Sequence, residues 1–344
     1  MAVGWLGHTT VRAQSQVDVG LAMPTLALQR WVIDGLALVR SFNGMRLVSD
    51  LQFANNDVPT QIAQIDNMLG KGTKVLIVAP IDGPALAPIL KKAADLKVRV
   101  ISYDRLIRDS PHVDYYATFD NFAVGVLQGT EIVRRLKLPE AKGPFNIELF
   151  GGSPDDNNAF FFYNGAMSVL KPYLDSGQLT VGSGQMGMDA VSTQAWSGVT
   201  ARFRFEKILE KTYAKQRLHA VLSPNDGIAI ELLQALKLKG YGTGGGHPWP
   251  VVSGQDADVQ SVRSIIRNEQ AFTIFKDNRE LALAAASMAQ AILTNKAPLV
   301  NDEKTYNNGV KAMSSLLLKP VTVDVNNWRE TLVTSGYYKD HMFR

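Results

Sequence analysis

Short apolar runs alternate with longer amphipathic stretches along almost the whole chain, and this alternation restricts the fold more than any other feature. The first series comprises QVDVGLAMP, RLVSDLQFA, KVLIVAPI and VRVISYD, with helical patterns reaching Arg40 and spanning residues 59–69 and 85–96. β-Branched runs separated by helices predict a parallel sheet covered by helices on both faces. This part of the chain is therefore expected to form one doubly wound α/β lobe.

A second series follows a helical pattern over residues 122–136. It comprises PFNIELFGG, LTVGSGQ, HAVLSPND, PVVSGQD and AFTIFK, and each run except the last is expected to precede a helix. The chain has 344 residues, which is long enough for two cores of ordinary size. We therefore predict two doubly wound parallel-sheet lobes of the α/β class. Residues 16–120 and 277–304 are expected in the N-terminal lobe, and residues 121–276 and 305–344 in the C-terminal lobe.

Composition and charge exclude several classes of protein. The hydrophobic share of 46% and the charged share of 20% are typical of a folded soluble protein. The net charge of +4 is spread without runs of like charge, which argues against binding to nucleic acid or to an anionic membrane. The chain has no cysteine and no apolar stretch of the roughly 20 residues that a membrane helix needs. Residues 1–15 are expected to be disordered or the remnant of a secretion leader.

Polar residues of both series gather where the predicted strands end. These residues are Tyr103-Asp104-Arg105, the stretch 151–158, Asn225-Asp226, Gln255-Asp256 and Lys276. In an open parallel sheet, ligands bind just outside the carboxyl ends of the strands. Two such edges that face each other would enclose a cleft. Within GGSPDDNN at 151–158, one or two side chains are expected to cap a helix and the others to face the cleft.

Several stretches of the chain resemble the periplasmic sugar-binding proteins of ABC importers. These are AMPTLALQRW, QIDNMLGKGTKVLIVAP, YDRLI, FDN, GGSPDDNNA, VLKPYLDSG, SGQDAD and IFKD, in that order. The resemblance is closest to the multiple-sugar and xylose-binding branch of the type I periplasmic binding protein family, the ribose/galactose-binding-protein-like class. It implies two lobes that are joined by three crossovers and close over one aldose. The crossovers are expected near Asp120-Asn121, near Lys276-Asp277 and between Asn301 and Asn308.

The resemblance also implies a set of sugar contacts. By position these are Arg30, Trp31, Asp104, Arg105, Asp156, Asn158, Trp196, Asn225, Asp256 and Lys276. Carboxylates accept hydrogen bonds from sugar hydroxyls, guanidinium groups donate to adjacent oxygens, and an indole covers the C–H face of the ring. The set contains three acids and three bases. This balance favours a neutral aldopyranose such as glucose, galactose, arabinose, xylose or fucose over a sugar phosphate or a sugar acid.

Structural roles for some of these residues stay open at this point. Asp104 and Arg105 could form an ion pair at a strand end, and Arg30 could extend its aliphatic stem beside a core Trp31. Asp226 is interpreted as a helix cap, which would leave Asn225 free for the ligand.

Enzymatic function is not expected. Glycoside hydrolysis needs an acid with a raised pKa, whereas the equal number of bases would hold both acids ionised. No G-x-S-x-G motif occurs, and the five histidines lack metal-ligand spacing. GYGTGGGH at 240–247 follows a helix instead of a strand, which disfavours a dinucleotide site. Neither a cofactor nor a metal is expected.

A sugar-responsive repressor is a further alternative with the same two-lobe core. Because the first strand begins near Gln16, we expect no room for a DNA-binding helix-turn-helix ahead of it. The remaining hypothesis is a periplasmic protein, with its leader removed or truncated, that delivers a monosaccharide to an ABC permease. Presentation of the closed form to a membrane sensor or chemoreceptor is the alternative. The protein is expected to be a monomer.

Overall fold

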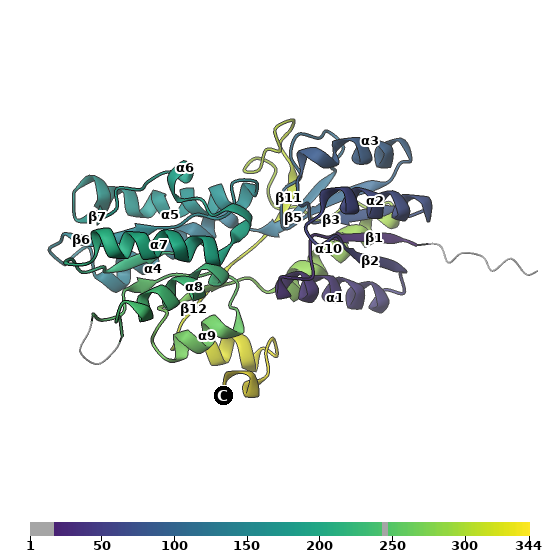
Figure 1. The fold of residues 1–344 in the computed structure, drawn as a ribbon. Helices are drawn as coiled ribbons and strands as arrows, with labels where there is room; N and C mark the ends of the chain where they lie inside the picture. The colour runs from purple at the N-terminus through teal and green to yellow at the C-terminus, as the bar shows by residue number, and fades with distance from the viewer. Residues whose placement is uncertain (1–16, 243–246) are drawn as a thin grey trace, which may run out of the picture.

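The computed structural model describes residues 17–242 and 247–344 and divides them into two α/β lobes that lie side by side (Figure 1). The expectation for residues 1–15 lies outside the described residues, as does the middle of the glycine-rich segment 240–247.

The N-terminal lobe is built on one six-stranded parallel sheet of order β11-β5-β4-β3-β1-β2. Its strands are β1 (Val19–Met23), β2 (Ser49–Phe53), β3 (Val75–Val78), β4 (Arg99–Tyr103), β5 (Tyr115–Phe119) and β11 (Ser314–Leu318). Helices α1 (Gln29–Gly44) and α10 (Asn278–Leu293) cover one face, and α2 (Val58–Gly70), η1 (Pro84–Leu86) and α3 (Ala87–Asp95) cover the other. Strands β1 and β3 are buried along their whole length, as apolar strands between two helical layers must be.

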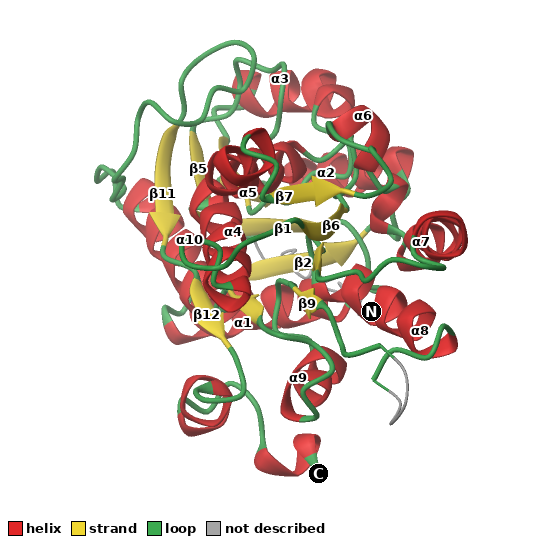
Figure 2. Cartoon of the chain, turned by 90° about the vertical axis from the view of Figure 1, so that its left-hand side faces the viewer, coloured by secondary structure: helices red, strands yellow, loops and turns green. Residues whose placement is uncertain are grey.

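The C-terminal lobe repeats this layering around a four-stranded parallel sheet of order β7-β6-β8-β9. The strands are β6 (Phe145–Leu149), β7 (Leu179–Val181), β8 (Ala220–Leu222) and β9 (Val251–Val252). Helices α4 (Asn121–Leu136) and α5 (Asn157–Asp175) lie on one face, and α7 (Gly198–Thr212) and α8 (Asp226–Leu238) on the other (Figure 2). Shorter elements are α6 (Met188–Val191), η2 (Gln194–Trp196), α9 (Val259–Ile266), η3 (Arg329–Thr334) and η4 (Asp340–Phe343).

A two-stranded antiparallel pair, β10 (Thr273–Phe275) and β12 (Val321–Val323), continues the second sheet. An isolated parallel bridge between Gln255 and Ile274 joins it to the segment after β9. Two parallel sheets were predicted, and the parallel part of each lobe has the expected order of strands and helices. The antiparallel β12 was not expected, because its sequence directly follows an apolar run that belongs to the other lobe.

Three short connections join the lobes. The chain crosses at Asp120 between β5 and α4, at Lys276-Asp277 between β10 and α10, and at Lys319-Pro320 between β11 and β12. The first two crossovers lie where they were expected. The third does not lie between Asn301 and Asn308 (Figure 1).

The boundary predicted at residue 305 is therefore displaced. Residues Ser314–Leu318 pair with Tyr115–Phe119 in parallel register and form the edge of the N-terminal sheet. The run SSLLLKPVTV contains two short strands of different sheets, and a single apolar run gives no sign of a change of sheet. Only the antiparallel partner of β10 reveals where the chain changes lobe.

The helix that follows AFTIFK corrects a second prediction. Helix α10 begins at Asn278, and the Asp277 side chain caps it by accepting a hydrogen bond from the Arg279 N–H at 3.0 Å. Its sequence is rich in alanine and leucine, which favour helix, and its apolar face packs on the first sheet beside α1. The helix belongs to the N-terminal lobe, so the second series does not end without one.

No helix among the described residues is long and apolar enough to cross a bilayer. The same part of the chain holds no group of three or more acids and histidines arranged to bind a metal ion.

Candidate functional site

A cavity of about 460 Å³ lies where the carboxyl ends of the two sheets meet. All ten residues implied as sugar contacts line it: Arg30, Trp31, Asp104, Arg105, Asp156, Asn158, Trp196, Asn225, Asp256 and Lys276. Further lining residues are Ala27, Leu28, Phe162, Gly227, Ile230, Gln255, Asp258, Val259, Gln260 and Arg263. Segments far apart in sequence thus converge on one space.

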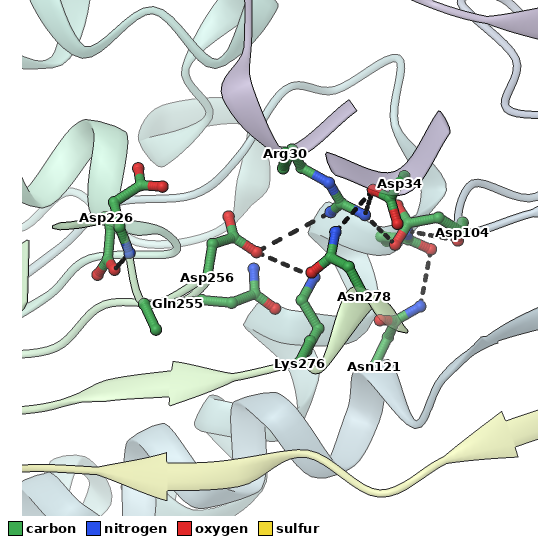
Figure 3. Close-up of polar contacts among 12 residues, drawn as sticks. Arg30, Asp34, Asp104, Asn121, Asp226, Gln255, Asp256, Lys276 and Asn278 are labelled. Carbon is green, nitrogen blue, oxygen red and sulfur yellow. Dashed lines mark hydrogen bonds and ion pairs between the residues drawn. The ribbon is translucent and has the colours of Figure 1, made fainter. Parts of the chain in front are cut away.

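Arg30 lies at the centre of the charged groups and contacts acids from both lobes (Figure 3). Its Nη2 is 2.8 Å from Asp104 Oδ2 and 3.3 Å from Asp34 Oδ2, and its Nη1 is 3.9 Å from Asp256 Oδ1. The guanidinium carbon also stands 4.3 Å from the ring centroid of Trp31, which forms a cation–π contact. Arg30 is therefore more than an aliphatic stem beside a core tryptophan, because its head group links the two lobes.

Lys276 joins the same chain of charges from the second crossover. Its Nζ is 3.2 Å from Asp256 Oδ1 and 5.5 Å from the ring centroid of Phe162. The residue is buried, so its charge needs these partners. Asp256 and Asp104 both adopt positive φ, at 98° and 59°, and such backbone conformations often occur where function requires a particular side-chain direction.

Arg105 and Asp156 form a second ion pair between the lobes, with Nε 3.1 Å from Oδ2. Asp156 also caps α5, because its Oδ1 accepts a hydrogen bond from the Asn158 N–H at 3.0 Å. The pairing of Arg105 with Asp156 replaces the alternative in which Arg105 would pair with its neighbour Asp104. One acid of the stretch 155–158 thus both caps a helix and faces the cavity.

Asn158 uses most of its amide within the protein. Its Oδ1 accepts from the Tyr116 hydroxyl at 3.2 Å and from Asn121 Nδ2 at 2.9 Å, and its Nδ2 donates to the Asp104 carbonyl at 2.9 Å. These bonds tie the start of α5 to the segment after β4 in the opposite lobe. One amide hydrogen is left for a ligand.

The roles expected for Asn225 and Asp226 are interchanged. Asn225 caps α8 by accepting from the Ile228 N–H at 3.0 Å. Asp226 is fully buried and accepts from Gln270 Nε2, Thr273 Oγ1 and the Asp258 N–H. The prediction that Asp226 is the cap is wrong, because burial among these donors holds its carboxylate away from the helix end. Asn225 still lines the cavity, with its amide nitrogen as the group left to donate.

Trp196 lines the cavity from the short helix η2, which follows α6, and its backbone adopts a positive φ of 55°. Its ring lies edge-on to Phe162, with centroids 6.3 Å apart. The ring also lies against Gly152, where an added Cβ would stand 2.1 Å from the indole. Of the three phenylalanines at 160–162, Phe162 is the one that lines the cavity.

Charges shift the pKa values of the acids in different directions. Burial alone would raise the pKa of Asp104, but the charges of Arg30 and Lys276 outweigh it and hold that pKa below its usual value. Burial raises the pKa of Asp156, and Arg105 offsets this only in part. The bases thus favour ionisation of both acids, as expected, but only at Asp104 does their effect on the pKa exceed that of burial.

Asp34 and Asp258 were missed from sequence, and Gln255 was placed at a strand end but not among the sugar contacts. Asp34 lies one helical turn after Arg30, and this i,i+4 spacing of opposite charges could have revealed it. It accepts a hydrogen bond from the Tyr103 hydroxyl at 2.6 Å. It also accepts from Asn278 Nδ2 at 2.7 Å, as Figure 3 shows. Burial raises the pKa of Asp34 to about 6, and the charge of Arg30 opposes this shift. Asp34 therefore holds Arg30 in place from behind the cavity wall.

Replacing Asp34 by asparagine is expected to remove part of the pH dependence of stability. Between pH 3.8 and about 6 the native carboxyl keeps a proton that the unfolded chain has lost. Binding of this proton therefore stabilises the folded state. The stabilisation is fully present below this pH range and is lost as the pH rises through it. The difference of about two pKa units between the native and the unfolded carboxyl corresponds to about 3 kcal/mol in the free energy of unfolding. Urea unfolding of both proteins at pH 4 and pH 7 measures it, and an unchanged pH slope in Asp34→Asn would contradict this account.

The layered lobes, the three crossovers and the cavity between the lobes define a two-lobed binding protein of the type I class. The family model described as "Periplasmic binding protein domain" matches residues 31–297. The chain belongs to this family.

Relatives are similar over nearly the whole chain. The multiple sugar-binding periplasmic protein SbpA of Azospirillum brasilense is 55% identical, covering 100% of this chain and 97% of that protein. The D-xylose-binding periplasmic protein of Escherichia coli is 34% identical over 96% of this chain and 94% of its own length. A solved ABC transporter solute-binding protein from Clostridium phytofermentans with bound β-D-glucose is 44% identical, with a TM-score of 0.90, and covers 95% of this chain and 99% of its own. These likenesses confirm the resemblance inferred from sequence.

Proposed function

We infer that this chain is a periplasmic solute-binding protein that captures a neutral monosaccharide between its lobes and delivers it to an ABC importer, without altering it. The observation that supports this most strongly is the chain of alternating charges across the cavity. Arg30 contacts Asp104 and Asp256, Lys276 contacts Asp256, and Arg105 contacts Asp156. Matched charges suit hydroxyls, which both donate and accept, and leave no surplus cation for an anionic sugar.

The residues divide into roles that suit a pyranose. Asp104, Asp156 and Asp256 would accept from hydroxyls, and Arg30, Arg105 and Lys276 would donate to ring or hydroxyl oxygens. Trp31, Phe162 and Trp196 supply aromatic surface for the C–H faces. A bound sugar would contact both lobes, so it would favour the closed form by those additional contacts, and closure is the change that a transporter can recognise.

The names of relatives support a sugar ligand. SbpA and the Rhizobium radiobacter receptor ChvE, which is also 55% identical, are both named for binding multiple sugars. The solved relative from Clostridium phytofermentans holds β-D-glucose. Presentation to a membrane sensor is not favoured by these likenesses. A monomeric state is part of the proposal, since the interlobe contacts of one chain account for every proposed sugar contact.

A thermal-shift panel followed by titration calorimetry tests the function. We expect one or more of glucose, galactose, arabinose, xylose and fucose to raise the melting temperature and to bind one sugar per chain, with the sugar recovered unchanged. A sugar phosphate is expected to bind more weakly than the free sugar. Tighter binding of the phosphate, or consumption of the sugar, would overturn the proposal.

A further inference from the structure

The floor and the rim of the cavity differ in chemistry. Asp104, Gln255 and Lys276 on the floor are each at least 96% buried, and they carry charges or an amide. The apolar rim consists of Ala27, Leu28, Ile230 and Val259, which are exposed or half-buried and come from both lobes. The polar groups that suit a sugar ring are thus concentrated at the floor.

Leu28 is the most prominent apolar residue of this rim. Its side chain is 46% exposed, although it borders the cavity two residues before Arg30. The loop is held in place, because the buried Thr25 hydroxyl accepts from the Ala27 N–H at 3.0 Å and the Leu28 carbonyl accepts from the Trp31 N–H at 3.1 Å. An exposed leucine at a fixed position beside a polar site offers apolar surface to a ligand.

The opposite side of the rim is formed by the N-terminal parts of two helices. Ile230 lies in α8 and Val259 begins α9, and both line the cavity. The polar side chains of this part of the rim are Asp258, Gln260 and Arg263, and Arg263 donates from Nε to the Met342 carbonyl at 2.9 Å. Asp258 and Arg263 carry opposite charges and Gln260 carries none, so this part of the rim has no net charge for a ligand group to match.

The volume also exceeds what one sugar ring needs. A cavity of about 460 Å³ lies in the range of pockets, about 300–1,000 Å³, that hold drug-sized ligands. A pyranose that bonds to the floor residues would leave the rim in contact with whatever the ring carries on its outward side.

We propose that the apolar rim of Ala27, Leu28, Ile230 and Val259 is a subsite for the aglycone of an alkyl or aryl glycoside. This inference rests on the proposed function, since the sugar ring of the glycoside occupies the floor. The anomeric oxygen is where sugars commonly carry an apolar group, and such a group would cover Leu28 and the N-terminal parts of α8 and α9. Each buried CH₂ tightens binding by about fourfold, and a phenyl group is expected to contribute about tenfold.

Calorimetry with the monosaccharide that binds most tightly, and with its α- and β-phenyl glycosides, tests the subsite. One anomer is expected to bind about tenfold more tightly than the free sugar. Leu28→Ser should reduce this ratio to about two while leaving the affinity for the free sugar unchanged, and Val259→Thr should reduce it less. Leu26→Ser is the matched control, because Leu26 is 54% exposed in the same loop but does not line the cavity.

The outcomes separate the two proposals. If the free sugar binds but neither phenyl glycoside binds more tightly, the subsite is wrong and the proposed function stands. If Leu28→Ser weakens the free sugar and the glycoside equally, Leu28 serves closure of the lobes and the subsite is also wrong. If no monosaccharide of the panel binds, the proposed function itself is overturned.

Discussion

Replacing Asp104 by asparagine is expected to weaken monosaccharide binding by more than about 100-fold. Asp104 is buried and paired with Arg30 at 2.8 Å, so the substitution removes a charge that the site depends on. The bound sugar would lose a charged hydrogen-bond acceptor, and removal of one partner of a buried, hydrogen-bonded charge pair weakens binding by about 2–5 kcal/mol. Asparagine tolerates the φ of 59° at this position, whereas alanine would add backbone strain.

The fold is expected to survive this substitution. The Asp104 carbonyl still accepts from the Tyr116 hydroxyl, Thr118 Oγ1 and Asn158 Nδ2. Titration calorimetry measures the affinity, and circular dichroism checks the fold. Asp50→Asn is the matched control, because Asp50 pairs with Lys71 at 2.7 Å in the same lobe but outside the cavity. Unchanged affinity in the Asp104 variant would remove this residue from the site.

Replacing Gly152 by alanine is expected to weaken binding by about 30-fold through Trp196. The new Cβ would stand 2.1 Å from the indole, so the ring must leave its place in the cavity. Loss of an aromatic surface against a sugar costs about 2 kcal/mol, which corresponds to this factor. The measurement is calorimetry combined with tryptophan fluorescence, which should report the displaced ring.

The neighbouring glycine provides the control. A Cβ at Gly151 would meet the sulfur of Met188 at 2.9 Å, and a flexible methionine end can move aside. Gly151→Ala is therefore expected to bind sugar within about twofold of the original protein. Equal losses in the two variants would mean that the segment as a whole, and not the Trp196 ring, determines affinity.

Much of the fold could be predicted because parallel strands with helices on both faces have a distinctive sequence pattern. Strand β3 is a continuous apolar run, and the helix α2 between β2 and β3 is amphipathic and is capped by Asp57. The third crossover could not be predicted in the same way. Strands β11 and β12 are separated by only Lys319 and Pro320. The sheet to which each strand belongs is determined by the strand it pairs with, and not by its own sequence.

The members of the candidate site could be predicted more reliably than their contacts. Strand ends and a family resemblance identified all ten residues, which the structure brings to one cavity, although their contacts with a sugar remain a prediction. The partner of each side chain depends on distances between lobes. No local pattern could reveal that Arg105 pairs with Asp156, or that the Asn278 amide binds Asp34 on the side away from Arg30's own helix. Asn225, and not Asp226, caps α8, because the Asp226 carboxylate accepts hydrogen bonds from donors about 30 to 50 residues away in the sequence.

The brevity of the three connections has a mechanical consequence. Each contains one or two residues, at Asp120, Lys276-Asp277 and Lys319-Pro320, so the halves of the molecule cannot slide past one another. Their relative movement is confined to rotation about an axis beside these tethers. Lys276 is part of one of these connections and lies at the inner end of the cavity. The width of the cavity therefore changes little at this inner end during the rotation, whereas it changes most at the opening. We therefore expect the protein to tolerate little variation in the size of the ligand group at the inner end of the cavity, and more variation in the group at the opening.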